Sequence, residues 1–159
     1  MLFDVFVLLL TFGVMEFVAW AAHKYLMHGF LWHWHEDHHQ GGYHPFQKND
    51  LFFLIFAIPS MTCLIVGPVY QLSWLMAVGF GIMLYGFCYF LVHDVVIHQR
   101  FKWFKHSNNR YIKAMRWAHK MHHRHLNKYD GESLGLLVFD LKYWQKIKND
   151  EKISQKKSN

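Results

Sequence analysis

Long apolar stretches of the chain set its expected architecture. Residues 51–92 contain no charged residue and no histidine. Because a membrane helix needs about 20 apolar residues to cross the hydrocarbon core, a run of this length predicts two crossings. The run breaks at residues 67–73, GPVYQLS, so the pattern predicts spans over 51–67 and 73–96 joined by a tight turn. Pro59 is expected to kink the first of them.

Another apolar stretch, Val5–Ala22, predicts a third span that carries one acid, Glu16. The chain opens Met-Leu-Phe-Asp, with no basic segment and no clear small-residue cleavage site, so we expect a permanent membrane helix rather than a signal peptide. Three buried helices of a soluble bundle are the alternative, which uncharged runs of this length disfavour. The expected fold class is an all-α integral membrane protein with about three transmembrane helices plus cytosolic helices.

The distribution of positive charge predicts the orientation. The formal charge of +6 would permit nucleic-acid binding, but all 17 Lys and Arg fall within residues 23–50 or from Arg100 onward. Basic residues in short loops mark the cytoplasmic side, so we expect the N-terminus outside and the C-terminus in the cytosol of a cell whose inner membrane holds the protein. Attraction to anionic headgroups then explains the bases without nucleic acid.

Three smaller features complete the organisation of the chain. Residues 99–116 mix bases with aromatics, which favours a membrane surface and, more weakly, a docking site for an acidic electron donor. Residues 141–159 are polar and lysine-rich, so residues 1–140 are expected to form the membrane-embedded domain and the rest a partly mobile tail. Cys63 and Cys88 lie inside expected spans, where they are interpreted as small apolar fillers.

Histidines form a repeated pattern on the expected cytosolic side. All 14 lie within residues 23–44 and 93–125. Two spacings, H-x4-H and then H-x-x-H-H, occur twice in the same order. The ten histidines of this pattern are His23, His28, His35, His38, His39, His93, His98, His119, His122 and His123. The histidines outside it, which are interpreted as surface or interfacial residues, are His33, His44, His106 and His125.

The spacing indicates a site for two metal ions. Helical positions i, i+3 and i+4 share one face, so an i,i+4 pair can chelate one metal while the i+3 histidine reaches a second. The H-x4-H pairs lie about 140° apart on an ideal α-helix. They can close a site only if the helix ends or distorts between them, or if the metals lie in the groove beside it. Gly29, directly after His28, fits a helix end.

The ligand type narrows the metal. Imidazole suits zinc, copper, iron and nickel. Ten nitrogens for two ions give about five each, which leaves room for one open position per metal, whereas a structural zinc site closes at four ligands. Two redox metals with open positions at a membrane face indicate oxygen chemistry on a lipid-soluble substrate.

At these residues the chain resembles the membrane fatty-acid hydroxylase superfamily and, within it, the bacterial β-carotene hydroxylases. The resemblance covers roughly residues 10–140. It rests on the histidine order and on the flanking segments Met15-Glu16, AHKYLMHG at 22–29, LVHDVVIHQR at 91–100, AHKMHH at 118–123 and GESLG at 131–135.

The resemblance implies a non-haem di-iron monooxygenase that uses O2. Its substrate would be β-carotene, hydroxylated at carbon 3 of the β-ionone rings through β-cryptoxanthin to zeaxanthin, with electrons from a ferredoxin-type partner. One iron would take His23, His28, His35, His39 and His122, and the other His38, His93, His98, His119 and His123. Zinc could replace iron in a heterologously expressed preparation, because imidazole accepts both ions.

Three acids are candidates for roles around the metals. Glu16 lies seven residues before His23, on nearly the same helix face, and an acid inside a span is usually functional. It is expected to face the bundle interior, where it would hold a histidine through water or line the substrate channel. Asp94 could accept an imidazole N–H from another ligand, and Asp37 lies inside the second histidine group.

Other functions remain as alternatives. A fatty-acid or sterol hydroxylase of the same superfamily would share every feature above. A membrane cytochrome with bis-histidine haem needs paired histidines within facing spans, and residues 51–92 contain none. A metal transporter would place ionisable residues near the midplane, where Glu16 is the one clear case.

Overall fold

Helices dominate the computed structural model, which describes residues 1–40, 47–129 and 131–158. The α-helices are α1 (Leu2–Ala21), α2 (Trp32–Gln40), α3 (Phe52–Val69), α4 (Ser73–Tyr89), α5 (Arg110–His122) and α6 (Leu141–Ser158). Two π-helical segments, η1 (Ala22–Phe30) and η3 (Phe90–Ile97), continue α1 and α4. Short 3-10 turns are η2 (Lys48–Leu51) and η4 (Lys102–Phe104).

In the described part of the chain, three helices are long and apolar enough to cross a membrane, which confirms the number of spans expected from the sequence. They are Leu2–Phe30, Lys48–Val69 and Ser73–Ile97. Each extends beyond the apolar run at the histidine-bearing end, because the π-helical and 3-10 segments continue the helices into polar sequence. Pro59 lies inside α3, and a kink there stays a prediction.

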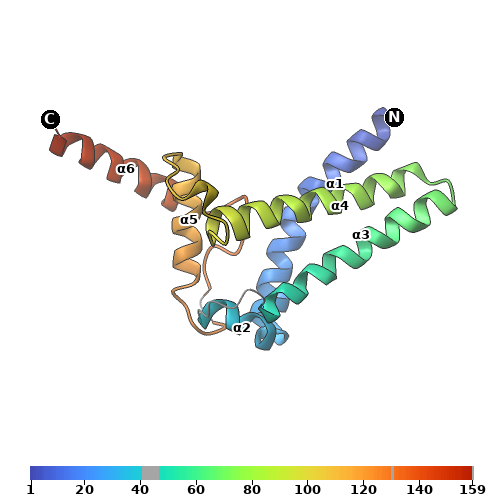
Figure 1. Ribbon diagram of the computed structural model, residues 1–159, viewed down its shortest axis with the longest axis horizontal. Coiled ribbons are helices and arrows are strands. Elements are labelled where there is room, and N and C mark those ends of the chain that lie inside the picture. Colours follow the sequence, from blue (N-terminus) through green and yellow to red (C-terminus); the bar gives the residue numbers. More distant parts are fainter. Residues whose placement is uncertain (41–46, 130, 159) are drawn as a thin grey trace.

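The long helices form a slanted hairpin crossed by a third helix. In Figure 1, α3 and α4 run side by side and α1 crosses next to α4; α4 packs against both. Gly81 permits close packing of α1 and α4, since a Cβ there would lie 2.7 Å from Cβ of Thr11 and 2.8 Å from the carbonyl oxygen of Leu8. The Ser60 hydroxyl ties α3 to α4 by donating to the Gly79 carbonyl over 2.8 Å.

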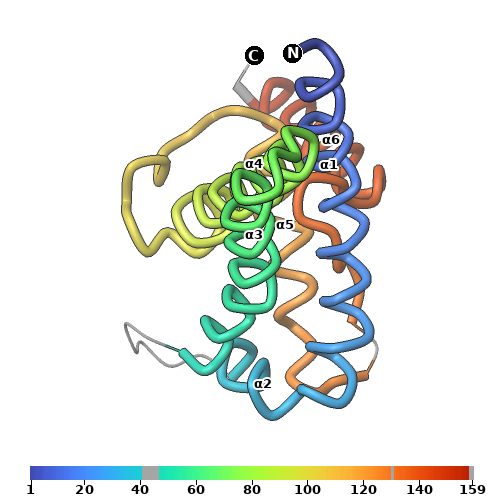
Figure 2. Tube along the Cα trace, turned by 90° about the vertical axis from the view of Figure 1, so that its right-hand side faces the viewer, coloured from blue at the N-terminus to red at the C-terminus, as the bar shows by residue number. Residues whose placement is uncertain are grey.

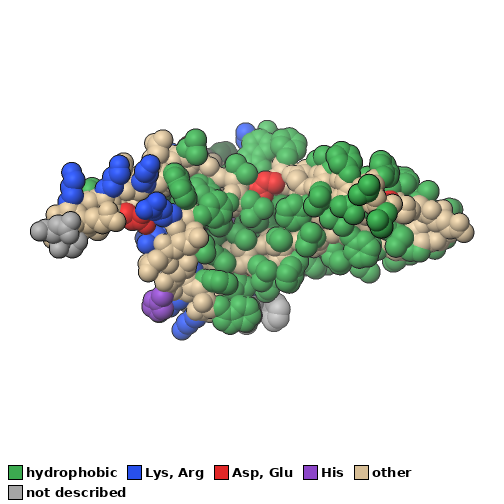
Figure 3. Space-filling model, turned by 90° about the horizontal axis from the view of Figure 1, so that it is seen from above, with side chains coloured by type: hydrophobic (Ala, Val, Ile, Leu, Met, Phe, Trp, Pro, Cys, Tyr) green, Lys and Arg blue, Asp and Glu red, His purple; other side chains and the backbone are tan. Residues whose placement is uncertain are grey.

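The two ends of the bundle differ in chemistry. At one end the Ser73 hydroxyl donates to Asp4 over 2.8 Å, which places the N-terminus beside the turn between α3 and α4 (Figure 1). At the other end α2 packs against η1 and η2, and α5 packs against η3; Figure 2 shows α2 at the lower end of the bundle and α5 behind α3. Hydrophobic side chains cover the long helices, whereas Lys and Arg side chains gather around α6 at the far end (Figure 3).

The polar C-terminal segment is helical. Helix α6 packs against α5; Tyr143 of α6 is buried, and Arg110 of α5 donates to Glu151 of α6 over 2.5 Å. The sequence pattern suggested a polar tail here, and it did not reveal the helix. The boundary between a domain at 1–140 and a tail at 141–159, and the mobility of the tail, stay predictions.

Candidate metal centre

The two H-x4-H pairs are closed by π-helical geometry. A π-helix bonds residue i to residue i+5, so it stacks residues five apart that an α-helix would turn away from each other. The backbone N–H of His98 donates to the carbonyl of His93 over 2.9 Å, which is an i+5 bond. Ring centroids lie 4.5 Å apart for this pair and 5.1 Å apart for His23 and His28. The helix distortion that the spacing required is therefore present, and non-helical backbone at Gly29 ends the first segment.

The two H-x-x-H-H groups lie on α2 and at the end of α5. His35, His38 and His39 on α2 are buried. His122 on α5 is also buried, and none of its surface is exposed. The rings of His39 and His122 lie 4.7 Å apart, and those of His38 and His123 lie 4.6 Å apart. The two groups therefore face each other, as expected if histidines from both helices surround the same metal sites.

The histidines separate into two clusters, each able to hold a metal ion. In each, one ring nitrogen per histidine lies within 4.8 Å of every other. We call them the proximal cluster and the distal cluster. The proximal cluster consists of His23, His28, His35, His39 and His122. The distal cluster consists of His38, His93, His98 and His119. Members i and i+4 of α2 thus fall in one cluster and member i+3 in the other.

Nε2 atoms converge inside both clusters. In the proximal cluster the Nε2 atom of His35 lies 3.1 Å from that of His23 and 3.2 Å from that of His39. In the distal cluster the Nε2 atoms of His98 and His119 lie 2.8 Å apart. Such separations between lone-pair nitrogens fit atoms that surround one ion.

His123 lies at the edge of the distal cluster. Its ring is 4.5 Å from that of His119 and 5.0 Å from that of His98. The Nε2 atoms of His123 and His38 are both buried and make no hydrogen bond in the described part of the chain. Because buried polar nitrogens without partners are rare, these two atoms fit a centre that binds metal.

Acceptors on the outer side of the rings select the tautomer that a metal needs. An amide oxygen or a carbonyl can only accept, so each fixes the proton on Nδ1 and leaves the Nε2 lone pair free. His35 Nδ1 donates to Asn49 over 2.6 Å, and His38 Nδ1 donates to Gln47 over 3.0 Å. Backbone carbonyls serve four proximal histidines: Leu134 for His23 at 3.0 Å, Lys128 for His28 at 3.3 Å, His125 for His39 at 2.8 Å and Glu132 for His122 at 3.1 Å.

Burial keeps the imidazoles neutral, which is the form that binds metals. Loss of hydration lowers the pKa of His39 to about 4. It also lowers the pKa of the other histidines of the repeated pattern that lie outside the membrane spans, namely His35, His38, His98, His119, His122 and His123.

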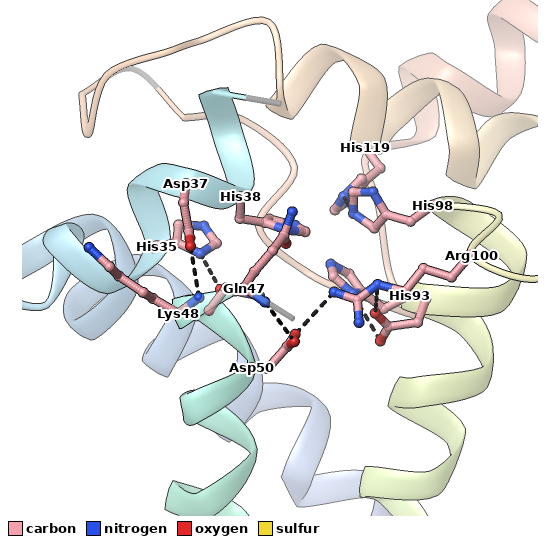
Figure 4. Close-up of polar contacts among 12 residues, drawn as sticks. His35, Asp37, His38, Gln47, Lys48, Asp50, His93, His98, Arg100 and His119 are labelled. Carbon is pink, nitrogen blue, oxygen red and sulfur yellow. Dashed lines mark hydrogen bonds and ion pairs between the residues drawn. The ribbon is translucent and has the colours of Figure 1, made fainter. Parts of the chain in front are cut away.

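The candidate residue Asp94 belongs to a chain of charges beside the distal cluster. Its Oδ2 lies 3.4 Å from Nδ1 of His93, its own neighbour, rather than beside a ligand from another segment. Its Oδ1 accepts from Arg100 over 3.0 Å, and Arg100 also donates to Asp50 over 3.0 Å (Figure 4). The sequence did not indicate this pairing; Arg100 lies in the turn after η3, and Asp50 lies in η2.

The other two candidate acids, Asp37 and Glu16, make no hydrogen bond to an imidazole in the described part of the chain. One oxygen of Asp37 accepts from the backbone N–H of Lys48 over 2.7 Å (Figure 4). Glu16 faces the bundle interior, as expected, but in the described part of the chain it bonds to Tyr85 and to the backbone of residues 136–138, not to a histidine, and it does not line the apolar cavity between α3 and α4.

The described histidines outside the repeated pattern, which are His33, His106 and His125, belong to neither cluster. His33 and His106 are exposed, and His44 lies outside the described residues. His125 contributes its carbonyl, not its ring, to the hydrogen bond with His39.

An apolar cavity of about 510 Å³ leads to the distal cluster. It lies between α3 and α4, with His93, Asp94 and Arg100 at its polar end. Phe53 and Met83 line the cavity and are also exposed on the outer surface, so the cavity opens toward the surroundings of the membrane helices. Its volume is within the usual range for cavities that enclose small ligands.

Comparison with known proteins assigns the chain to a family of hydroxylases. The family model described as fatty acid hydroxylase matches residues 8–146, and the chain belongs to this family. The β-carotene hydroxylase of Pseudescherichia vulneris is 38% identical over 125 residues, which cover 77% of this chain and 69% of that protein. The β-carotene hydroxylase of Pantoea ananas is also 38% identical over 125 residues, covering 77% of this chain and 70% of that protein.

Similarity extends to plant proteins. The chloroplastic β-carotene 3-hydroxylase of Gentiana lutea is 35% identical over 127 residues, which cover 78% of this chain and 39% of that protein. No solved structure shows a significant match to the chain.

Proposed function

We propose that the protein is an O2-dependent β-carotene 3-hydroxylase with two iron ions, which converts β-carotene through β-cryptoxanthin to zeaxanthin. The observation that carries the proposal is the apolar cavity between membrane helices that ends at a histidine cluster. The names of the relatives in bacteria and plants support a carotenoid as the substrate.

Each iron would have five histidine ligands. The proximal cluster would hold one ion, and the distal cluster together with His123 would hold the other, so the catalytic centre would use all ten histidines of the repeated pattern. The buried, partnerless Nε2 atoms of His38 and His123 support this division. When bound, the metal pair supplies the oxygen activation that cleavage of an unactivated ring C–H bond requires.

The chain's own part is to position the substrate and exclude water. Aromatic and aliphatic side chains of α3 and α4 would hold one ring at the polar end of the cavity, while the polyene leaves through the open side into lipid. Asp94, paired with Arg100, would fix the orientation of His93 at the polar end of the cavity, where the ring of the substrate would bind.

The surroundings of the reaction follow from charge and hydropathy. The histidine-bearing end would face the cytosol from the inner membrane, because the basic residues lie at that end. A ferredoxin-type protein would deliver electrons there, attracted by the bases of residues 99–116. A fatty-acid or sterol hydroxylase is the second candidate, because the mostly apolar lining of the cavity would suit several kinds of lipid.

Expression in a β-carotene-producing host tests the proposal, with pigment analysis as the measurement. Zeaxanthin and β-cryptoxanthin are the expected products, and the variant His35→Ala is the matched control without activity. Unchanged β-carotene at a normal level of inserted, iron-loaded protein would contradict the proposal, and new hydroxylated fatty acids or sterols would support the second candidate.

A further inference from the structure

Glu16 makes four hydrogen bonds that involve no histidine. Its Oε1 accepts from the backbone N–H groups of Leu136, Leu137 and Val138 over 3.0, 2.8 and 3.0 Å. Its Oε2 accepts from the hydroxyl of Tyr85 over 2.8 Å. A carboxylate that accepts several N–H groups is held more strongly than a neutral acceptor, because the bonds are charge-assisted.

The bound segment is a tight turn that depends on glycine. A Cβ at Gly135 would lie 2.3 Å from the carbonyl oxygen of Val138 and 3.4 Å from Oε1 of Glu16. Ser133, two residues earlier, has a left-handed backbone with φ of 60°. In this conformation the turn presents three consecutive N–H groups to one oxygen, and the half-buried carboxylate of Glu16 accepts from all of them.

The same segment supplies acceptors to the proximal cluster. The carbonyl of Leu134 accepts from His23, and that of Glu132 accepts from His122. Both lie within a few residues of the amides that Glu16 holds. Tyr111 on α5 fastens the far side of the turn by donating to the Leu137 carbonyl.

We infer that Glu16 is a positioning residue that holds residues 131–138, and through their carbonyls the proximal cluster, in the geometry for metal binding. Tyr85 extends this connection to the cavity, because it lines the cavity and donates to Glu16. The inference rests on the proposed metal centre, and it assigns Glu16 an action through the backbone rather than through water or substrate. Among the described residues, no carbonyl of residues 131–138 accepts from a histidine of the distal cluster, whose outer partners include Gln47 and Asp94.

Metal binding by purified protein in detergent tests this inference. Apo-protein would be titrated with Co²⁺, whose absorption bands report each site, for wild type, Glu16→Leu and Glu16→Gln. We expect Glu16→Leu to weaken one of two sites about 10- to 100-fold, the usual effect of losing outer partners of a ligand, and to leave the other unchanged. Glu16→Gln keeps an oxygen acceptor without the charge, so its loss should be smaller.

Asp4→Asn is the matched control, because Asp4 is also an acid on α1 but lies at the opposite end, beside Ser73. It should bind both ions as the wild type does. Faster amide hydrogen exchange at residues 136–138 in Glu16→Leu would accompany the weakened site.

Two results would overturn the inference. Unchanged affinity at both sites in Glu16→Leu would show that the turn holds without the carboxylate. Equal weakening of both sites, with no rescue by Glu16→Gln, would show general destabilisation of the protein. If the wild type bound no metal, the proposed function itself would fail, and that outcome is seen before any variant is made.

Discussion

Asn49 offers a sharp test of how the outer partners control the proximal cluster. Its side-chain oxygen accepts from Nδ1 of His35 over 2.6 Å, and His35 is almost wholly buried. Asn49→Leu removes that acceptor while keeping a similar volume. The Nδ1–H group then lies buried without a partner, or the proton moves to Nε2 and blocks the metal-binding nitrogen.

The size of the effect follows from the cost of the lost bond. Leaving a buried donor without a partner costs about 1–3 kcal/mol. At about 1.4 kcal/mol per tenfold change, this corresponds to roughly 5- to 150-fold weaker metal binding. Loss of outer partners elsewhere gives about 10- to 100-fold, in agreement with this range.

Competition with a chelator during metal titration measures the effect. We expect one weakened site in Asn49→Leu, recovery in Asn49→Asp, which restores an acceptor oxygen, and no change in Asn108→Leu at an exposed position of the loop before α5. Wild-type affinity at both sites in Asn49→Leu would refute the argument that this hydrogen bond sets the tautomer of His35.

Other substitutions test separate parts of the account. Alanine at any one of the paired ligands should abolish zeaxanthin formation in the β-carotene-producing host, because each removes half of an i,i+4 pair; these ligands are His35, His39, His119 and His123. His33→Ala and His125→Ala should keep most activity, since neither ring lies in a cluster, and a loss equal to that of the ligand variants would show that the division of the histidines is wrong. Asp94→Asn should lower turnover by about tenfold or more while the protein stays folded, because it weakens the pair with Arg100 beside His93. Wild-type turnover in this variant would show that Asp94 does not act on the reaction through His93. Gly81→Leu should reduce the yield of folded protein, since overpacking costs typically about 1–3 kcal/mol; an unchanged melting temperature would contradict the close contact of α4 with α1.

The sequence predicted the spans and the grouping of histidines because both depend on local patterns. Residues 51–92 are uncharged, so two crossings follow directly from the thickness of a bilayer. The spacing within α2 likewise predicts that His35 and His39 serve one metal while His38 reaches the second, and the structure places His35 and His39 in one cluster and His38 in the other. The H-x4-H pairs required a distortion that the sequence left open, and the π-helical bond between His93 and His98 supplies it.

Long-range backbone contacts had no signal in the sequence. The carbonyls of Leu134 and Glu132 accept from histidines about 110 and 10 residues away, and a carbonyl is the same for every residue type. Glu16 was expected to face the interior because an exposed acid in lipid is costly, and it does so. Besides the Tyr85 hydroxyl, its partners are the backbone amides of residues 136–138, which no pattern of side chains could indicate. From the sequence, the GESLG segment at 131–135 was notable only as part of the family resemblance. The close approach of the Val138 carbonyl to Gly135 gives the physical reason for a glycine there.

The iron content of the active, purified protein tests the central claim most directly. The structure has two clusters of histidines, and within each cluster the ring nitrogens lie within 4.8 Å of one another. Each cluster should hold one ion, which gives two ions per chain. Metal analysis of a preparation that converts β-carotene, reconstituted with Fe²⁺ to full activity, should therefore give two iron ions per chain. One iron ion or fewer per chain at full activity would contradict the two-metal centre.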